Sequence, residues 1–197
     1  MAAGEPVRNR VMLALAYDAA LRREELCSLR TDDLDPARRM LRIRAETTKN
    51  RLERVVPYSA PTGVLLSGNL VHRAMISRAR GPLFLSESRR NRAAPLSLWT
   101  WSKVVRRLAL AAELPQFSTH TTRHLCLTDL ARMGWELHAI ATFAGLHTGL
   151  HPPVRPRSGR QAQPGYGADP RLAGPHVGPA RGTGVGGGQA VITALRF

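Results

Sequence analysis

The composition of this chain changes abruptly after about Leu150, and that change limits where a fold can form. Residues 151–197 contain ten glycines, seven prolines and six arginines, but only one acidic residue and no lysine. No apolar period runs through them, so they bury too little apolar surface to offset the conformational entropy that folding costs. We therefore expect a folded domain in residues 1–150 and a disordered tail in residues 151–197.

Apolar residues recur at helical spacing through most of the first 150 residues. The spacing predicts helices over residues 7–20, 20–29, 65–78, 97–112, 118–134 and 136–143. The first of them is expected to be amphipathic, with one buried stripe. Ser118 or Thr119 can cap the fifth helix, and Gly134 can end it. Three aromatic residues are expected to complete the core rather than to bind a ligand: Trp99, Trp101 and Phe117.

A short β segment interrupts this helical pattern. Met40–Arg44 alternates apolar and basic residues, which is the period of a half-buried strand. Arg54–Tyr58 has the composition of a second strand, in which Pro57 favours a sheet edge or a strand terminus. Thr47–Arg51 would connect the two strands, and Thr31–Pro36 has the composition of a turn. The predicted fold class is therefore mainly α with a small antiparallel β-sheet (α+β).

The chain carries a large excess of positive charge. Its 29 lysines and arginines against 14 acidic residues give a formal net charge of +15. Such an excess favours a polyanionic partner, nucleic acid first, because neutralising phosphates releases counterions and so supplies affinity. A GC-rich genome that inflates the arginine content would produce part of the same excess without any partner.

Cysteine usage and hydropathy bear on the cellular compartment. Cys27 and Cys126 lie in predicted helices and outside any paired motif, which argues against a disulfide framework or a thiolate zinc site. The first nine residues lack the apolar segment of a signal peptide, and no run approaches the ~18 apolar residues of a membrane helix. We therefore expect a cytoplasmic protein without membrane association.

The segment Ser118–His124 concentrates side chains that can do chemistry. His120, Arg123 and His124 fall on one side of a predicted helix start, because residues three and four apart are neighbours on a helix surface. Outside this segment, three further polar residues punctuate the apolar pattern: Arg22, Lys49 and His147.

Four segments, in this order, resemble the motifs of the tyrosine recombinase catalytic domain, the phage integrase family. They are Ala20–Leu26 for the first-arginine motif, Thr48–Arg51 with Arg54–Pro57 for the lysine hairpin, Thr119–His124 for the His-x-x-Arg-His motif, and Ile140–Gly145 with His147 for the last histidine turn. The resemblance spans about Val7 to Leu150. It implies a recombinase-like catalytic domain and, for the function, site-specific recombination or integration of a mobile element.

The resemblance also implies roles for individual residues in breaking and rejoining DNA through a 3′-phosphotyrosine intermediate. Arg22 and Arg123 would hold the nonbridging phosphate oxygens, where negative charge accumulates. Lys49 would protonate the departing 5′ hydroxyl, His120 would assist proton transfer at the nucleophile, and His147 would donate a hydrogen bond to the phosphate.

Partners and cofactors follow from the same resemblance. Double-stranded DNA would be bound by Arg22, Lys49, Arg51 and Arg123, and four copies would associate on it. A phosphotyrosine ester conserves the bond energy of the broken strand, so neither a metal nor a nucleotide cofactor is implied.

The nucleophilic tyrosine is not assigned. Tyr17 and Tyr58 lie far upstream, in a predicted helix and a predicted strand, and are expected to serve the core. Tyr166 is the only tyrosine after His147, and it stands in the Gly/Pro-rich tail with no predicted helix to position it. The family's Gly-His pair is also split here by Leu146. Our hypothesis for the tail is that a reading-frame change near residues 145–150 replaced the native C-terminus, and the lack of a tyrosine-bearing helical segment in the other two frames would contradict it.

Each assigned residue also has an ordinary structural interpretation. Arg22 can belong to an exposed cluster of charges, and Lys49 can be a surface lysine in a turn. His120, His124 and His147 could bind zinc, although the glutamate of a metalloprotease motif is missing. For the whole chain, two alternatives remain open: a basic protein that binds DNA without cutting it, and a decayed recombinase fragment, which the short N-terminus would suggest.

Overall fold

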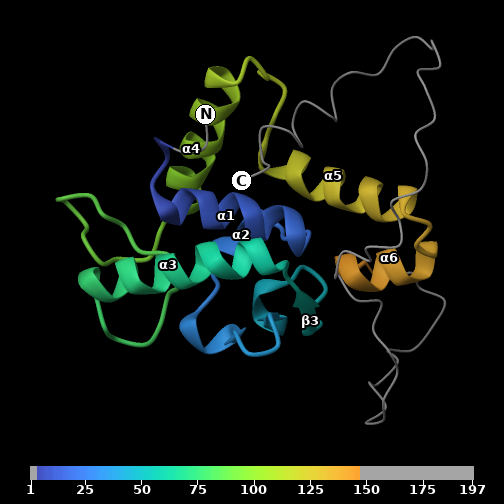
Figure 1. Ribbon diagram of the computed structural model, residues 1–197, viewed down its shortest axis with the longest axis horizontal. Coiled ribbons are helices and arrows are strands. Elements are labelled where there is room, and N and C mark those ends of the chain that lie inside the picture. The colour runs from blue at the N-terminus through green and yellow to red at the C-terminus, as the bar shows by residue number, and fades with distance from the viewer. Residues whose placement is uncertain (1–3, 147–197) are drawn as a thin grey trace.

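The computed structural model is a helical domain with one small sheet (Figure 1). It describes residues 4–146, so the tail, His147 and Tyr166 lie outside the described residues. The α-helices in this range are α1 (Val7–Asp18), α2 (Arg23–Cys27), α3 (Ala60–Ile76), α4 (Leu98–Ala111), α5 (Thr119–Arg132) and α6 (Leu137–Ala144). The predicted class, mainly α with a small antiparallel sheet, is confirmed.

The sheet has three antiparallel strands in the order β1-β2-β3. They are β1 (Leu34–Asp35), β2 (Met40–Ile43) and β3 (Arg54–Pro57), with 3₁₀ turns η2 (Thr31–Asp33) before β1 and η3 (Ala45–Thr47) after β2. Leu41 pairs with Val56, and both are buried. β3 lies at the sheet edge, as Pro57 predicted. The strand β1 was not predicted from the sequence, because it has only two residues. Its Leu34 pairs with Leu41 of β2.

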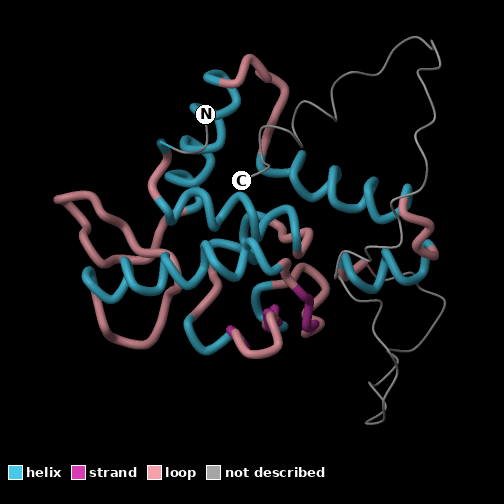
Figure 2. Tube along the Cα trace, in the orientation of Figure 1, coloured by secondary structure: helices cyan, strands magenta, loops and turns pink. Residues whose placement is uncertain are grey.

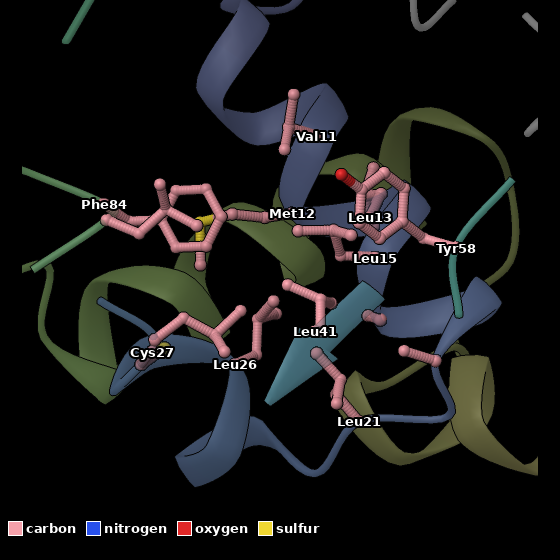
Figure 3. Packing of buried hydrophobic residues seen from close by; sticks show 14 of the residues in the cluster. Val11, Met12, Leu13, Leu15, Leu21, Leu26, Cys27, Leu41, Tyr58 and Phe84 are labelled. Carbon is pink, nitrogen blue, oxygen red and sulfur yellow. The ribbon is translucent and has the colours of Figure 1, made fainter. Parts of the chain in front are cut away.

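Helix α1 lies at the centre of the domain, between α3 and α5 (Figure 2). Every residue from Val11 to Ala16 is buried. The expectation of a single buried stripe on this helix was therefore wrong, because neighbouring elements cover it on more than one side. Figure 3 shows the resulting core, in which Met12 and Leu15 of α1 gather with Leu41 of β2 and with Phe84 of the segment between α3 and α4.

The chain bends sharply after α1. Ala20 has a φ of +46°, a left-handed conformation that is uncommon for a residue with a Cβ. The helix predicted over residues 20–29 is consequently shortened to α2. Arg22, with φ −72° and ψ 156°, is extended and becomes the N-cap of α2. The bend thus fixes where Arg22 stands.

A second apolar cluster joins α5 and α6 to this bend. It contains Ala20, Cys126, Leu130 and Ile140, which are all buried. The Trp135 and Phe143 rings close its edge, 5.9 Å apart between centroids and 72° between planes. The cluster holds α5 and α6 against the end of α1.

Capping residues explain three of the observed helix ends. Ser118 caps α5 by accepting a hydrogen bond from the His120 backbone N–H at 3.3 Å, as the sequence predicted. Helix α3 begins at Ala60 rather than at residue 65, because Ser59 caps it and Pro61 fits its first turn. Gly145, with φ +62°, ends α6 in the left-handed conformation that glycine adopts without strain.

The three aromatic residues assigned to the core differ in their burial. Trp101 is 1% exposed, and Phe117 packs against the main core. Trp99 is 67% exposed, so its assignment to the core was wrong. Residues two apart point to different sides of a helix, and on α4 the Trp101 side faces the core. Trp99 instead lies under the Lys103 ammonium group, 3.6 Å from its ring centroid.

The two tryptophans of α4 give a matched test of this packing. We expect Trp101→Ala to lower the free energy of unfolding by about 4 kcal/mol, because it leaves a cavity in the core. Trp99→Ala should change it by less than about 1 kcal/mol, the cost of one exposed cation–π contact. Urea unfolding of both variants checks the difference. Equal losses would contradict the placement of α4.

Candidate functional site

Arg22 is held by a carboxylate on the same short helix. The Glu25 carboxylate accepts one hydrogen bond from the Arg22 backbone N–H and another from its guanidinium Nη1, both at 2.9 Å. The spacing of three residues lets the two side chains meet at the first turn of α2. The Arg22 side chain remains 21% exposed, so it can still contact a ligand.

Glu25 is bound on its other side by Arg54, at the start of β3. Arg54 donates from Nη1 to Oε1 at 3.0 Å and from Nη2 to Oε2 at 2.7 Å, which is a bidentate pair. The Glu25 side chain is fully buried. Burial by itself raises the pKa of this carboxyl, but the hydrogen bonds and charges of Arg54 and Arg22 outweigh burial and hold the pKa below its ordinary value of 4.5. Glu25 is therefore ionised at neutral pH.

Arg123 lies on α5 and reaches the ends of two other helices. Its Nη1 donates to the Ala20 carbonyl at 2.5 Å, and its Nη2 donates to the Ala144 carbonyl, the last of α6, at 2.7 Å. Burial lowers the pKa of Arg123 to about 10, and the positive charge of Arg22 adds to that effect. Arg123 is thus a buried cation that stays protonated at neutral pH.

The charges of Arg22, Arg54 and Glu25 all act on Arg123. The charges of Arg22 and Arg54 lower the pKa of Arg123, while that of Glu25 raises it. One carboxylate therefore balances a group of three guanidinium charges. Such an undercompensated, partly desolvated cluster favours an anionic ligand.

An open cleft of about 840 Å³ brings Arg22 and Lys49 to the same surface. One wall is formed by Glu24, Cys27 and Ser28, another by residues 46–49, and a third by residues 95–98. The structure thus unites, in one cleft, two of the residues that the sequence assigned to a site.

Two hydrogen bonds, made by Thr48 and Asn50, hold the turn that carries Lys49 in place. The Thr48 hydroxyl accepts a hydrogen bond from the Leu52 backbone N–H at 3.0 Å, which closes the turn. Asn50 Nδ2 donates to the Gly145 carbonyl at 3.3 Å, so the turn also contacts the end of α6. Lys49 itself is exposed, and so is Arg51 two residues later.

The two described histidines of the motif are both exposed. His120 lies in the first turn of α5 and His124 one turn later. The pKa of Glu24, a residue of the cleft, is lowered: burial opposes the shift, and hydrogen bonds from Arg23 and the backbone, with the nearby Arg23 and His120 side chains, outweigh burial. His120 is therefore close to the cleft. His147 lies outside the described residues.

Two residues of this site were missed from the sequence. Glu25 stood within the first-arginine motif and a charge cluster, and Arg54 within a predicted strand and the lysine hairpin motif, but neither was assigned a role of its own. The spacing Arg22-x-x-Glu25 carried a signal for the first, since residues three apart meet on a helix. No local signal identifies Arg54, because its contact with Glu25 joins residues 29 positions apart.

Residues 4–146 contain no group of three or more His, Cys, Asp or Glu side chains placed to hold a metal ion. None of the described helices combines the length and the apolar character that a membrane span requires.

The sequence and the fold are similar to those of known proteins. Residues 1–149 match the model of the phage integrase family. The tyrosine recombinase XerC of Mycobacterium sp. (strain KMS) is 30% identical over 149 residues, which cover 74% of this chain and 48% of that protein. XerC of Mycobacterium leprae (strain TN) is 29% identical over 151 residues, covering 75% and 49%. The chain thus spans about half the length of these relatives.

Solved recombinase structures share the fold. The crystal structure of XerA recombinase matches with a TM-score of 0.64 at 23% identity and covers 73% of this chain and 50% of its own. XerH bound to a palindromic difH substrate, in a post-cleavage complex, matches with a TM-score of 0.61 at 21% identity, covering 72% and 39%. With the family match over three quarters of its length, the chain belongs to the phage integrase family.

Proposed function

We propose that the protein breaks and rejoins DNA strands in site-specific recombination or integration. The observation that carries this proposal is the group of Arg22, Arg54 and Arg123 around the Glu25 carboxylate, beside a cleft that holds Lys49 as well as Glu24 and Glu46. A phosphodiester supplies the negative charge that this group lacks. Membership of the phage integrase family supports the same reaction.

In the proposed reaction, Arg22 and Arg123 hold the nonbridging oxygens of the scissile phosphate. Fixed guanidinium groups stabilise the charge that develops there in the transition state. Arg123 is buried and is not among the residues that line the cleft, but it gives only two of a guanidinium's five N–H donors to main-chain carbonyls, and we propose that a remaining donor binds the phosphate. Arg22 faces the cleft with a partly exposed side chain.

Proton transfer is assigned to residues around the same cleft. Lys49 protonates the departing 5′ hydroxyl, and its exposed ammonium group lines the cleft with Arg22. His120 assists proton transfer at the nucleophile, and His147 donates a hydrogen bond to the phosphate. A tyrosine attacks phosphorus and keeps the strand as a phosphotyrosine ester, so the reaction calls for no cofactor.

Double-stranded DNA is the proposed partner. Beside the cleft, α4 presents Trp99, Lys103 and Arg106 on an exposed face, and Arg51 adds a cation near Lys49. Lysine and arginine bind backbone phosphates irrespective of sequence. The structure of the Tn1549 transposon integrase in complex with a circular intermediate DNA, which shares the fold with a TM-score of 0.57 at 19% identity, supports DNA binding by this chain. We extend the proposal to a tetramer on DNA, in the cytoplasm of a cell that carries the mobile element.

A second candidate function is DNA binding without cleavage. It is supported by the positions of the two described tyrosines, Tyr17 and Tyr58. Tyr58 is buried in the main core, and the Tyr17 hydroxyl donates to Asp129 at 2.7 Å. Both therefore serve packing, as the sequence predicted, and neither lines the cleft. Tyr166 lies outside the described residues and stays an unassigned candidate nucleophile.

Salt dependence tests the proposed phosphate contact of Arg22. We expect Arg22→Ala to weaken duplex binding about tenfold, the effect of losing one charge-assisted hydrogen bond of about 1.5 kcal/mol. The slope of log K against log salt should also fall by about 1. Arg38→Ala is the matched control, because Arg38 is exposed in the β1–β2 turn and outside the cleft. Equal effects of the two variants would contradict the contact.

A suicide substrate distinguishes cleavage from binding alone. The full chain is incubated with nicked duplex, and a denaturing gel is examined for a covalent protein–DNA species. We expect cleavage activity to yield such a band and Lys49→Ala to lower its yield at least tenfold, as is usual for loss of a general acid. A band that vanishes with Tyr166→Phe identifies the nucleophile. DNA retention without any band would establish the binding function instead.

A further inference from the structure

Arg54 is almost as buried as the carboxylate that it binds. Its side chain is 9% exposed, and its two terminal nitrogens are both committed to Glu25. Its Nε is buried and finds no hydrogen-bond partner among the described residues. A buried ion pair of this kind often contributes less stability than apolar residues of similar volume, so its use here points to a requirement for defined geometry.

Arg54 also contacts the end of α6. A Cβ atom at position 145 would lie only 2.8 Å from Arg54 Nη1 and 3.2 Å from Arg54 Cζ. The backbone of Gly145 therefore rests directly against the guanidinium group. The preceding residue, Ala144, provides the carbonyl that Arg123 binds. Arg54 therefore contacts both Glu25, which binds Arg22, and Gly145, which follows the residue whose carbonyl Arg123 binds.

We propose that Arg54 is the positioning residue of the site: through Glu25 it orients Arg22, and through Gly145 it fixes the end of α6 relative to Arg123. Arg54 contacts no reacting group in this assignment. It sets the separation of the two arginines that hold the phosphate, and in that respect the inference rests on the proposed function.

Two alternative roles for Arg54 make different predictions. A purely structural role would lower stability without changing the environment of Arg22. A direct role as one more phosphate cation would weaken DNA binding additively with Arg22→Ala. Positioning through Glu25 requires that Arg54→Met act on Arg22, so the two substitutions combine less than additively.

The first test measures the pKa of Glu25 by NMR titration of the full chain with ¹³C-labelled glutamate. We expect Arg54→Met to raise this pKa, because burial then acts with less compensation. Gly145→Ala should raise it too, since the new Cβ displaces the guanidinium. Gly134→Ala is the matched control: Gly134 also has a positive φ, +84°, but a Cβ there meets nothing within 4 Å.

A second control tests the selectivity of that measurement. Arg107 makes an analogous bidentate pair with Glu5, at 2.8 and 2.9 Å, and is 59% exposed. Arg107→Met should raise the pKa of Glu5 and leave that of Glu25 unchanged. If Arg54→Met does not fold, Arg54→Lys, which keeps the charge but loses the bidentate geometry, replaces it and should raise the Glu25 pKa in the same direction.

The second test is duplex binding by the same variants. We expect Arg54→Met to weaken binding about tenfold, as Arg22→Ala does, and the double variant to bind no more than about threefold more weakly than Arg22→Ala alone. Additive losses, or a Glu25 pKa that is unchanged in both Arg54→Met and Gly145→Ala, would overturn the inference. If the unmodified chain does not bind DNA, the proposed function fails, and the pKa comparison alone decides the positioning role.

Discussion

The geometry of the site depends on one buried carboxylate. Glu25 accepts two hydrogen bonds from Arg22 and two from Arg54, and so joins α2 to the edge of the sheet. Without it, two guanidinium groups would repel each other at close range in a partly desolvated environment. The carboxylate compensates enough of this charge for the domain to fold, and leaves enough uncompensated to attract an anion.

Three segments that are distant in the sequence meet because the main chain ends helices at defined places. The left-handed Ala20 ends α1 and exposes the carbonyl that Arg123 binds, while Gly145 ends α6 close to Arg54. The buried helix α1 provides the fixed base for both arrangements, since it packs against α3 and α5. Positions of the site residues therefore follow from backbone conformation as much as from side-chain chemistry.

Local patterns were enough to predict the fold class and several helix ends. The Ser118 cap and the edge position of Pro57 follow from interactions within a few residues, which a sequence displays directly. The burial of α1 on more than one side and the exposure of Trp99 depend on which elements pack together, and periodicity does not contain that information. The family motifs predicted that Arg22 and Lys49 share a site. The role of Arg54 and the burial of α1 were not predicted for the same reason, because both depend on contacts between residues that are distant in the sequence.

The most direct test of this account is the pH dependence of stability in Glu25→Gln, measured by urea unfolding. The pKa of Glu25 is lowered in the folded state, so its ionic contribution is present above pH 4.5 and is lost as the pH falls through the folded-state pKa. We predict that the free energy of unfolding of the wild type exceeds that of Glu25→Gln by about 3 kcal/mol at neutral pH, and that this difference shrinks below pH 4.5. Glu24→Gln, at a more exposed position, should have a small effect on the free energy of unfolding at every pH. A difference that does not vary with pH, or a more stable Glu25→Gln at neutral pH, would contradict it.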